Sequence, residues 1–446
     1  MPNRLTGRVF DADDRRLLRL AGPAFLTLSA EPIYVLADTA IVGRIGTSEL
    51  GGLAIAGTVL STLTWLIAFL ASGITTQVAQ RRGAGDEAGA RAAVSQGLVV
   101  AIALGVLTAS VAGFGARAVA SRVGGRGDVL DAAVTYLRIS SLGLPAIALA
   151  LLATGWYRGI ENLRLPVRLA IGTNLANVVL EMVFVWVFHW GIAGSAAGTV
   201  VVQWTAVLVY TAALRGVIRL QRPRAASLRS LLRIGVAMVI RTALMVSTLS
   251  GSTWLASRIS DQALGAHQIG VQIFLLLALM IDALAVSSQS VFANRLGSAT
   301  AGSSELWSVT RRLIRLGVIV GIGLGLVVVI LSPVLGHAFS GDASVVSRSF
   351  PVLLLVGVLQ VSGAVVFVLD GVLMGADLFP WLAGGAVAAA ACFWGVALLQ
   401  RTSIPVVSGL SGVWVAVNVW MVARLIGNVS IARRFLRPGS VPAEYN

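Results

Sequence analysis

The sequence predicts an all-α polytopic membrane protein with twelve transmembrane helices, arranged as two six-helix lobes related by pseudo-two-fold symmetry. Three observations lead to this fold class. They are a composition poor in charge, twelve long apolar runs, and a repeat that relates the first half of the chain to the second.

The composition already indicates a membrane protein. Of the 446 residues, 57% are hydrophobic and 12% are charged, whereas about 25% of a typical soluble domain is charged. The mean hydropathy is +0.87. One spanning helix takes roughly 20 apolar residues, so the apolar residues suffice for about a dozen spans. The apolar runs are continuous rather than alternating, which argues against a transmembrane barrel.

Twelve apolar runs predict the spans in chain order. They cover about residues 20–43, 53–74, 93–115, 130–154, 167–189, 192–214, 234–256, 266–290, 313–331, 350–374, 381–400 and 404–426. The first run begins only at Leu20 and contains two acidic residues. We therefore expect it to be retained as a helix rather than removed as a signal peptide.

The basic residues predict the orientation. All 34 of them are arginines, and the formal net charge is +15. With both termini in the cytoplasm, 25 arginines fall in or beside cytoplasmic segments, Arg424 among them, against seven on the other side; Arg138 and Arg241 lie inside spans. This is the positive-inside bias. It assigns the basicity to topology rather than to nucleic-acid binding, and it predicts a multi-pass protein of the inner (plasma) membrane.

A repeat at a shift of 214 residues divides the chain. The shift aligns Arg44 with Arg258, Arg81 with Arg295, Gly83 with Gly297, and Pro166 with Pro380. Each half holds six spans and enters from the cytoplasm, so the repeat is parallel, which is typical of transporters with alternating access. We expect a cytoplasmic N-terminal segment (1–19), an N-lobe (20–214), a cytoplasmic linker (215–233), a C-lobe (234–426) and a cytoplasmic tail (427–446).

The sequence lacks the residues that several other classes of protein require. The single cysteine, Cys392, lies in an apolar run, and the histidines His189, His267 and His337 are far apart, so the chain offers no metal site. No GxxxxGK[ST] loop is present, which argues against an ATP-driven pump. An integral membrane enzyme would need a clustered catalytic constellation, so we expect neither an enzyme nor a cofactor.

Five acidic residues lie inside the predicted spans: Glu31, Asp38, Glu181, Asp282 and Asp370. An acid near the bilayer centre costs a few kcal/mol or more and generally faces an interior cavity.

In the C-lobe, Arg241 is a candidate ion-pair partner of Asp282. Two roles of Asp282 remain open, an ion pair with Arg241 and a contact with the substrate. We interpret Gln268 as a helix–helix hydrogen-bonding group. The candidates for a substrate cavity are Glu31, Asp282, Asp370, Gln268 and Arg241.

Two helix faces carry polar side chains at matching spacing. They are Glu31, Tyr34 and Asp38 on span one, and Asn174, Asn177 and Glu181 on span five. If the two faces meet inside the N-lobe, the two carboxylates would share a poorly hydrated pocket that disfavours their double ionisation. One of them could then carry a proton. The same oxygen-rich group could instead hold Na⁺.

The prolines of span one predict a bend. Pro23 and Pro32 remove backbone donors and leave carbonyl groups that need other partners.

Several segments carry a family resemblance. They are the span-one run Pro32-Ile33-Tyr34-Val35-Leu36-Ala37-Asp38-Thr39-Ala40-Ile41-Val42-Gly43-Arg44-Ile45-Gly46-Thr47, then Arg158-Gly159 with Pro166, Asn174 with Asn177 and Glu181, Leu264-Gly265-Ala266-His267-Gln268-Ile269, and Asp370-Gly371 with Gly375-Ala376. Together they resemble multidrug and toxic compound extrusion (MATE) transporters, in particular their DNA-damage-inducible F (DinF) branch. The resemblance covers nearly the whole chain.

The resemblance implies the MATE fold and a cation-coupled antiporter in which Asp38 is the protonation site of the N-lobe. It places in the same network Tyr34, Asn177, Glu181 and, on span six, Thr199. Pro23 matches the proline at which the first helix bends. Glutamate stands at 181 where the family usually has aspartate, which leaves the coupling ion open.

We therefore expect a monomeric secondary antiporter, embedded in membrane lipids, that exports amphipathic, cationic organic compounds in exchange for H⁺, with Na⁺ as the runner-up. A lipid-linked glycan flippase of the same superfamily is an alternative, disfavoured because the spans hold two arginines against five acids. Export of a specific metabolite also remains open. A channel suits the two-lobe repeat less well.

Overall fold

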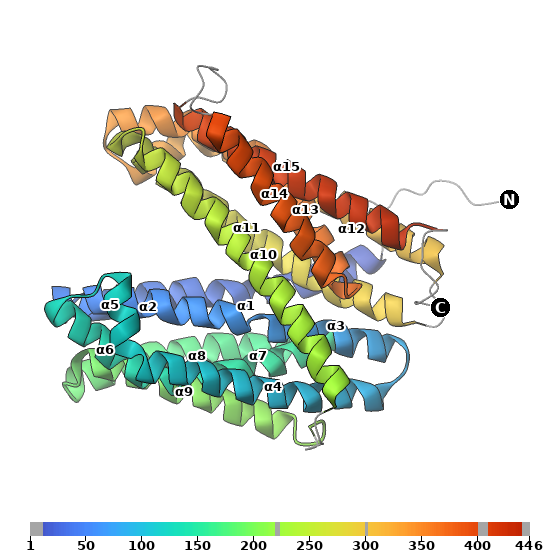
Figure 1. Ribbon diagram of the computed structural model, residues 1–446, viewed down its shortest axis with the longest axis horizontal. Helices are drawn as coiled ribbons and strands as arrows, with labels where there is room; N and C mark the ends of the chain where they lie inside the picture. The colour runs from blue at the N-terminus through green and yellow to red at the C-terminus, as the bar shows by residue number, and fades with distance from the viewer. Residues whose placement is uncertain (1–11, 219–223, 299–301, 400–408, 439–446) are drawn as a thin grey trace. The chain divides into compact units, whose positions relative to one another are not determined.

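The computed structural model describes residues 12–218, 224–298, 302–399 and 409–438, and their side chains except those of 12–19 and 30–33. These residues form helices joined by short turns (Figure 1). In the first half the elements are α1 (Ala12–Val42), α2 (Thr47–Ile67), α3 (Phe69–Gly83), α4 (Glu87–Phe114), α5 (Ala116–Val123), α6 (Gly127–Ser141), α7 (Leu144–Gly159), α8 (Arg164–Met182), the π-helical turn η1 (Val183–Val187) and α9 (Gly191–Ala213). In the second half they are α10 (Ala225–Ser257), α11 (Asp261–Gly297), α12 (Ser303–Phe339), α13 (Ala343–Gly375), α14 (Phe379–Leu399) and α15 (Gly409–Leu436).

The helices match the predicted spans in number and order. Within the described residues, 11 helical segments are long and apolar enough to cross a membrane. The pair α6 and α7, which meet at an angle of 48°, forms the twelfth. Most helices extend beyond the predicted runs, because polar residues near the ends of a span can stay helical after the apolar stretch has ended.

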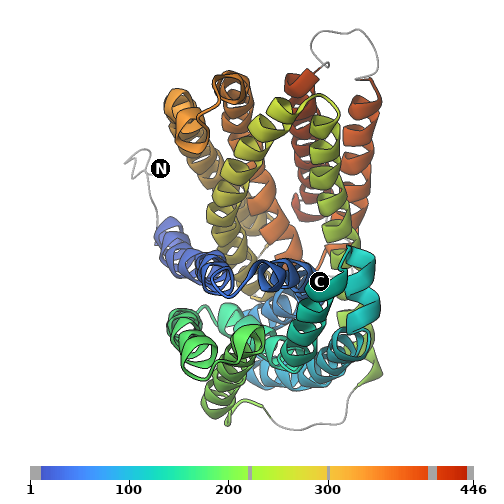
Figure 2. The ribbon, with the colours of Figure 1, turned by 90° about the vertical axis from the view of Figure 1, so that its left-hand side faces the viewer.

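The chain separates into two compact units. The first, called the N-unit here, is Leu26–Val239, and the second, the C-unit, is Ile240–Asn446 together with the residues before Leu26. The boundaries pass through α1 and α10. Figure 2 shows the helices of the N-unit, coloured blue to green, close to end-on as a bundle.

Side-chain caps mark the start of three helices. In each case the N-cap side chain accepts a hydrogen bond from a backbone N–H group of the first turn. Asp86 accepts from Gly89 (2.7 Å), Ser260 from Ala263 (3.1 Å) and Asp342 from Ser344 (2.7 Å). Each bond satisfies a donor that has no partner within the helix. Short polar turns thus separate the apolar helices.

The fourth span is bent where α6 ends and α7 begins. Pro145 is the second residue of α7, and it has no N–H to donate to the carbonyl of Ser141, so the helical ladder is interrupted there. Trp204 of α9 donates its indole N–H to the carbonyl of Leu142 (3.0 Å). A side chain from a neighbouring helix therefore serves backbone at the break.

The two prolines of span one both lie within α1, which is continuous from Ala12 to Val42. The side chain of Pro32 is outside the described side chains. A bend at Pro23 or Pro32 stays a prediction.

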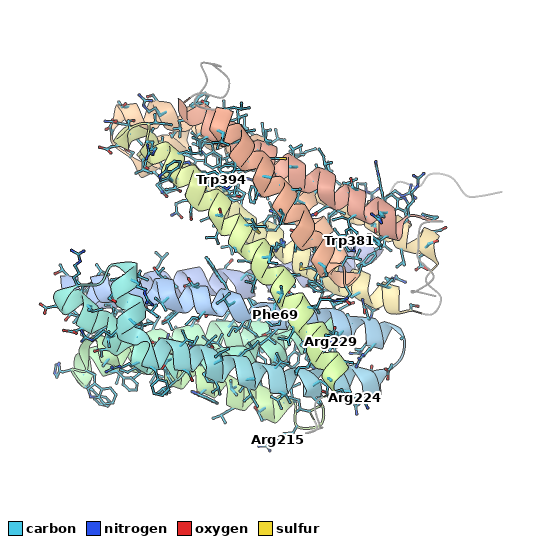
Figure 3. All side chains as sticks on the ribbon, viewed as in Figure 1. Phe69, Arg215, Arg224, Arg229, Trp381 and Trp394 are labelled. Carbon is cyan, nitrogen blue, oxygen red and sulfur yellow. The ribbon has the colours of Figure 1, made fainter. Side chains whose placement is uncertain are left out.

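The C-unit has an aromatic core. Trp414, Trp420 and Phe393 are at most 1% exposed and pack with aliphatic side chains from α11 and α13. Trp394 of α14 packs against Gly251 of α10 (Figure 3). Large rings of one helix therefore fill the space beside small residues of its neighbours, as in other membrane bundles.

Candidate functional site

Asp38 is buried in the N-unit and held by two hydroxyl groups. Its side chain is 5% exposed. Ser195 of α9 donates to Oδ1 across 2.7 Å, and the hydroxyl of Tyr136 on α6 lies 3.5 Å from Oδ2. The first bond is short and the second is at the upper limit for a hydrogen bond. Three helices that are distant in the sequence therefore meet at this carboxylate.

Thr199 connects the polar faces of α1, α8 and α9. Its Oγ1 lies 2.9 Å from the hydroxyl of Tyr34, accepts from Nδ2 of Asn177 (3.2 Å), and donates to the carbonyl of Ser195 (3.2 Å). Because its single proton goes to that carbonyl, the Tyr34 hydroxyl is the donor in the first contact. Thr199 thus joins the two polar faces predicted for spans one and five.

Glu181 is the most deeply buried member of the group. It is 0% exposed, and neither carboxylate oxygen has a hydrogen-bond partner among the described residues. It lies close enough to Asp38 for the two charges to interact. An ionised carboxylate without partners is very costly in such surroundings. A proton or a bound cation on Glu181 would remove that cost.

The polar group borders two adjoining cavities, of about 360 Å³ and 330 Å³. Both are lined by Tyr34, Thr64, Thr199 and Gln203, with Asp38 in the first and Asn174 and Asn177 in the second. All of these residues belong to the N-unit. The polar group therefore borders space large enough for a small molecule or an ion.

The structure therefore brings together the six predicted cation-coupling residues, with Asn174 in the cavity wall and the other five in mutual reach. Three further residues were missed by the sequence analysis: Ser195, Tyr136 and Gln203. Ser195, Thr199 and Gln203 follow one another at intervals of four residues on α9, a spacing that could have revealed Ser195 and Gln203. Tyr136 has only Ser140, one turn later on α6, as a polar neighbour at this spacing.

The C-unit contains a second polar group, centred on Asp370 of α13. This side chain is 2% exposed and accepts from Arg241 (2.5 Å), from Arg424 (2.7 Å) and from Nδ2 of Asn428 (2.7 Å). Arg424 also stacks over the ring of Trp420, with 5.1 Å between guanidinium carbon and ring centroid. Asp370 thus binds two guanidinium groups at once.

The structure corrects two predictions, the position of Arg424 and the partner of Arg241. Arg424 was assigned to the cytoplasmic boundary, but it is 4% exposed within α15, which continues to Leu436. The apolar run ends near Arg424, whereas the helix does not, because buried partners on other helices compensate its charge. Arg241, expected opposite Asp282, pairs with Asp370; Asp282 is half-buried on α11.

Two candidates for the substrate cavity remain. Gln268 is exposed on α11. Glu31 belongs to α1, but its side chain lies outside the described side chains. Among the described residues, no three His, Cys, Asp or Glu side chains are grouped so that they could hold a metal ion.

Comparisons with known proteins support the same fold. A protein-family model described as MatE matches residues 23–183 and 237–392. Protein DETOXIFICATION 45, chloroplastic, of Arabidopsis thaliana is 30% identical, over 93% of this chain and 78% of its own length. DNA damage-inducible protein F of Escherichia coli K12 is 25% identical, over 96% of this chain and 94% of its own.

Solved structures agree in fold. A crystal structure of MATE in the bent conformation superposes with a TM-score of 0.86 at 19% identity, covering 94% of this chain and 95% of that one. An outward-facing multidrug resistance MATE family transporter gives 0.83 at 19% identity, over 93% and 94%. These likenesses confirm the predicted two-lobe helical architecture. From the family model and the relatives together, the chain belongs to the MatE family of transporters, the multidrug and toxic compound extrusion family, and is of the DinF-like type.

Proposed function

We propose that this transporter is a secondary antiporter that exports amphipathic, cationic organic compounds in exchange for H⁺, with Na⁺ as the second candidate ion. The observation that carries the proposal is the buried pair Asp38 and Glu181, where neither Glu181 oxygen has a described hydrogen-bond partner and Asp38 borders a cavity. We place the protein in the inner (plasma) membrane, as a monomer with cytoplasmic termini.

The coupling would act through the charge of this pair. A proton on the pair removes one negative charge from a poorly hydrated site, whereas its loss leaves two carboxylates that repel each other. Loss or gain of the proton would change the packing of α1, α8 and α9, which meet at Asp38, Glu181 and Thr199. Ion and substrate need only differ in their affinity for the two states of the transporter.

Na⁺ is the alternative occupant because the site is rich in oxygen. Oδ1 of Asn177 is also without a described partner, and it lies in the same group as the carboxylates of Asp38 and Glu181. Oxygen ligands of this kind suit hard cations. The glutamate at 181 would set how closely the second carboxylate approaches such an ion.

Transport into proteoliposomes tests the proposal. A fluorescent organic cation would be followed under an imposed pH gradient and then under an imposed Na⁺ gradient, for the wild type, for Asp38→Asn, and for the control Asp131→Asn, which removes an exposed acid of the same unit. We expect transport driven by the pH gradient, lost in Asp38→Asn and kept in the control. A response to the Na⁺ gradient alone would identify Na⁺, rather than H⁺, as the coupling ion. No response to either gradient would refute cation-coupled export of such compounds.

One observation favours a second candidate function, export of an anionic metabolite. Asp370 binds two guanidinium groups, from Arg241 and Arg424, so the interior of the C-unit is less acidic than the sequence alone indicates. A fluorescent aromatic carboxylate in the same assay distinguishes the two. Its transport in place of the cation would assign an anionic substrate, and Arg241, Asp370 and Asp282 would then be the first residues to substitute.

A further inference from the structure

The N-unit has an open groove beside the bend of the fourth span, separate from the cavities at Asp38. Its volume is about 550 Å³, and it is lined by Val106, Phe114, Arg138, Ser141, Leu142 and Pro145 among others. Three of these apolar side chains are strongly exposed, Val106 at 52%, Phe114 at 95% and Leu142 at 62%. Helices α4, α6 and α7 thus present an apolar trough with one charged side chain in it.

That charged side chain, Arg138, lies within a membrane-spanning stretch. It is the twelfth residue of α6, and α6 and α7 pass together as one bent span. Ser141, the last residue of α6, packs against Gly113 next to the end of α4, so Arg138 lies level with that end of α4. An arginine near the end of a span pairs with a polar group or extends toward the interface.

The described residues offer the Arg138 guanidinium no such partner. Only its backbone carbonyl takes part in a side-chain hydrogen bond, from Ser141 (2.7 Å). Asp131 lies two turns earlier on the same face of α6, but it is paired with Arg117 (2.5 Å). The partner of the exposed guanidinium therefore has to come from outside this part of the chain.

We propose that the groove binds one anionic phospholipid, whose phosphate pairs with Arg138 and whose acyl chain lies along Val106, Phe114 and Leu142. A guanidinium offers planar, paired donors that match phosphate oxygens. The apolar trough supplies the second half of the site, which favours a lipid over free phosphate. In the predicted topology, α4 ends and α6 begins on the outer side, so the lipid belongs to the outer leaflet of this membrane.

The groove lies on one face of the bend, and the Asp38 cavity lies on the other. Gly113 of α4 packs against Ser141, which closes the floor of the groove. Tyr136, Ser140 and Ile147, from the same two helices, line the cavity. A lipid held at Arg138 would thus support the bend from the side opposite the candidate coupling site.

Native mass spectrometry of the purified full chain, titrated with phosphatidylglycerol in detergent, tests this site without any transport assay. The variants are Arg138→Gln, which removes the guanidinium, and Arg122→Gln, which removes an exposed charge of α5. We expect one phosphatidylglycerol to bind about tenfold more weakly to Arg138→Gln, since a charge-assisted bond is lost, and unchanged binding to Arg122→Gln. Equal binding by Arg138→Gln and the wild type, or equal weakening in both variants, would overturn the proposal.

Two further arms identify the occupant. Phosphatidylcholine, whose choline offsets the phosphate charge, should bind more weakly than phosphatidylglycerol, and inorganic phosphate at millimolar concentration should not displace the bound lipid. Equal affinity for the two lipids would contradict an anionic occupant. Displacement by inorganic phosphate would contradict a lipid.

Discussion

Ser195 donates a hydrogen bond of 2.7 Å to Oδ1 of Asp38, although the two residues are 157 positions apart in the chain. This bond gives one oxygen of a buried carboxyl group its hydrogen-bond partner. Ser195 is 0% exposed, and water is therefore a poor substitute for it. This contact connects α9 directly to the acid that we propose for coupling.

Ser195→Ala should destabilise the site around Asp38. The variant leaves Oδ1 of a buried carboxylate without its donor at 2.7 Å, and a buried acceptor without a partner costs ~1–3 kcal/mol. Thermal unfolding in detergent measures the loss. Ser110→Ala, which removes an exposed hydroxyl bonded only to its own helix, is the control and should leave the unfolding temperature unchanged. Equal unfolding temperatures for the two variants would mean that the Ser195 hydroxyl does not stabilise this site.

Glu181→Gln should preserve stability. Neither oxygen of Glu181 has a hydrogen-bond partner among the described residues, so the nearly isosteric glutamine breaks no described bond and removes the cost of a buried charge. Thermal unfolding in detergent checks this, with Glu87→Gln, a half-exposed partner of Arg82, as the control. A variant clearly less stable than the wild type would show that the carboxylate of Glu181 stabilises the folded state.

Asp370→Asn should be strongly destabilising. The change leaves the guanidinium groups of Arg241 (13% exposed) and Arg424 (4% exposed) without their carboxylate. Removal of one partner of a buried pair costs ~3–5 kcal/mol. Asp131→Asn is the matched control, since its pair with Arg117 is 63% exposed on both sides and should contribute less than ~1 kcal/mol. Denaturant unfolding in detergent measures both. Similar losses in the two variants would mean that the Asp370 group does not hold α10, α13 and α15 together.

Gly371→Ala should separate α11 from α13. A Cβ at Gly371 would lie 2.2 Å from the carbonyl oxygen of Ala285, which is backbone and cannot turn aside. We expect a loss of ~1–3 kcal/mol, as for other overpacked sites. At Gly363 on the same helix, the nearest atom would be 3.9 Å away, so Gly363→Ala should be tolerated. Equal unfolding temperatures for the two variants would contradict the close approach of the helices.

Asp38, Glu181 and Tyr34 were predictable from the sequence because an acid or a tyrosine at helical spacing in an apolar run is conspicuous there. Arg424 and Asn428 were not, although they are four residues apart on one helix face. Arg424 lies at the end of a predicted apolar run and Asn428 just beyond it. Hydropathy does not distinguish an arginine at an interface from one whose charge is compensated by Asp370 of another helix.

What the sequence determined by itself was local: the number and order of the apolar helices, the repeat between the halves, and which polar side chains share one face of one helix. Each follows from the helical period or from the length of an apolar run. Which faces meet was decided by the tertiary structure, because it depends on how side chains of different helices fill space together. That packing pairs Ser195 with Asp38, gives Asp370 two arginines, and leaves Arg138 exposed in an apolar groove.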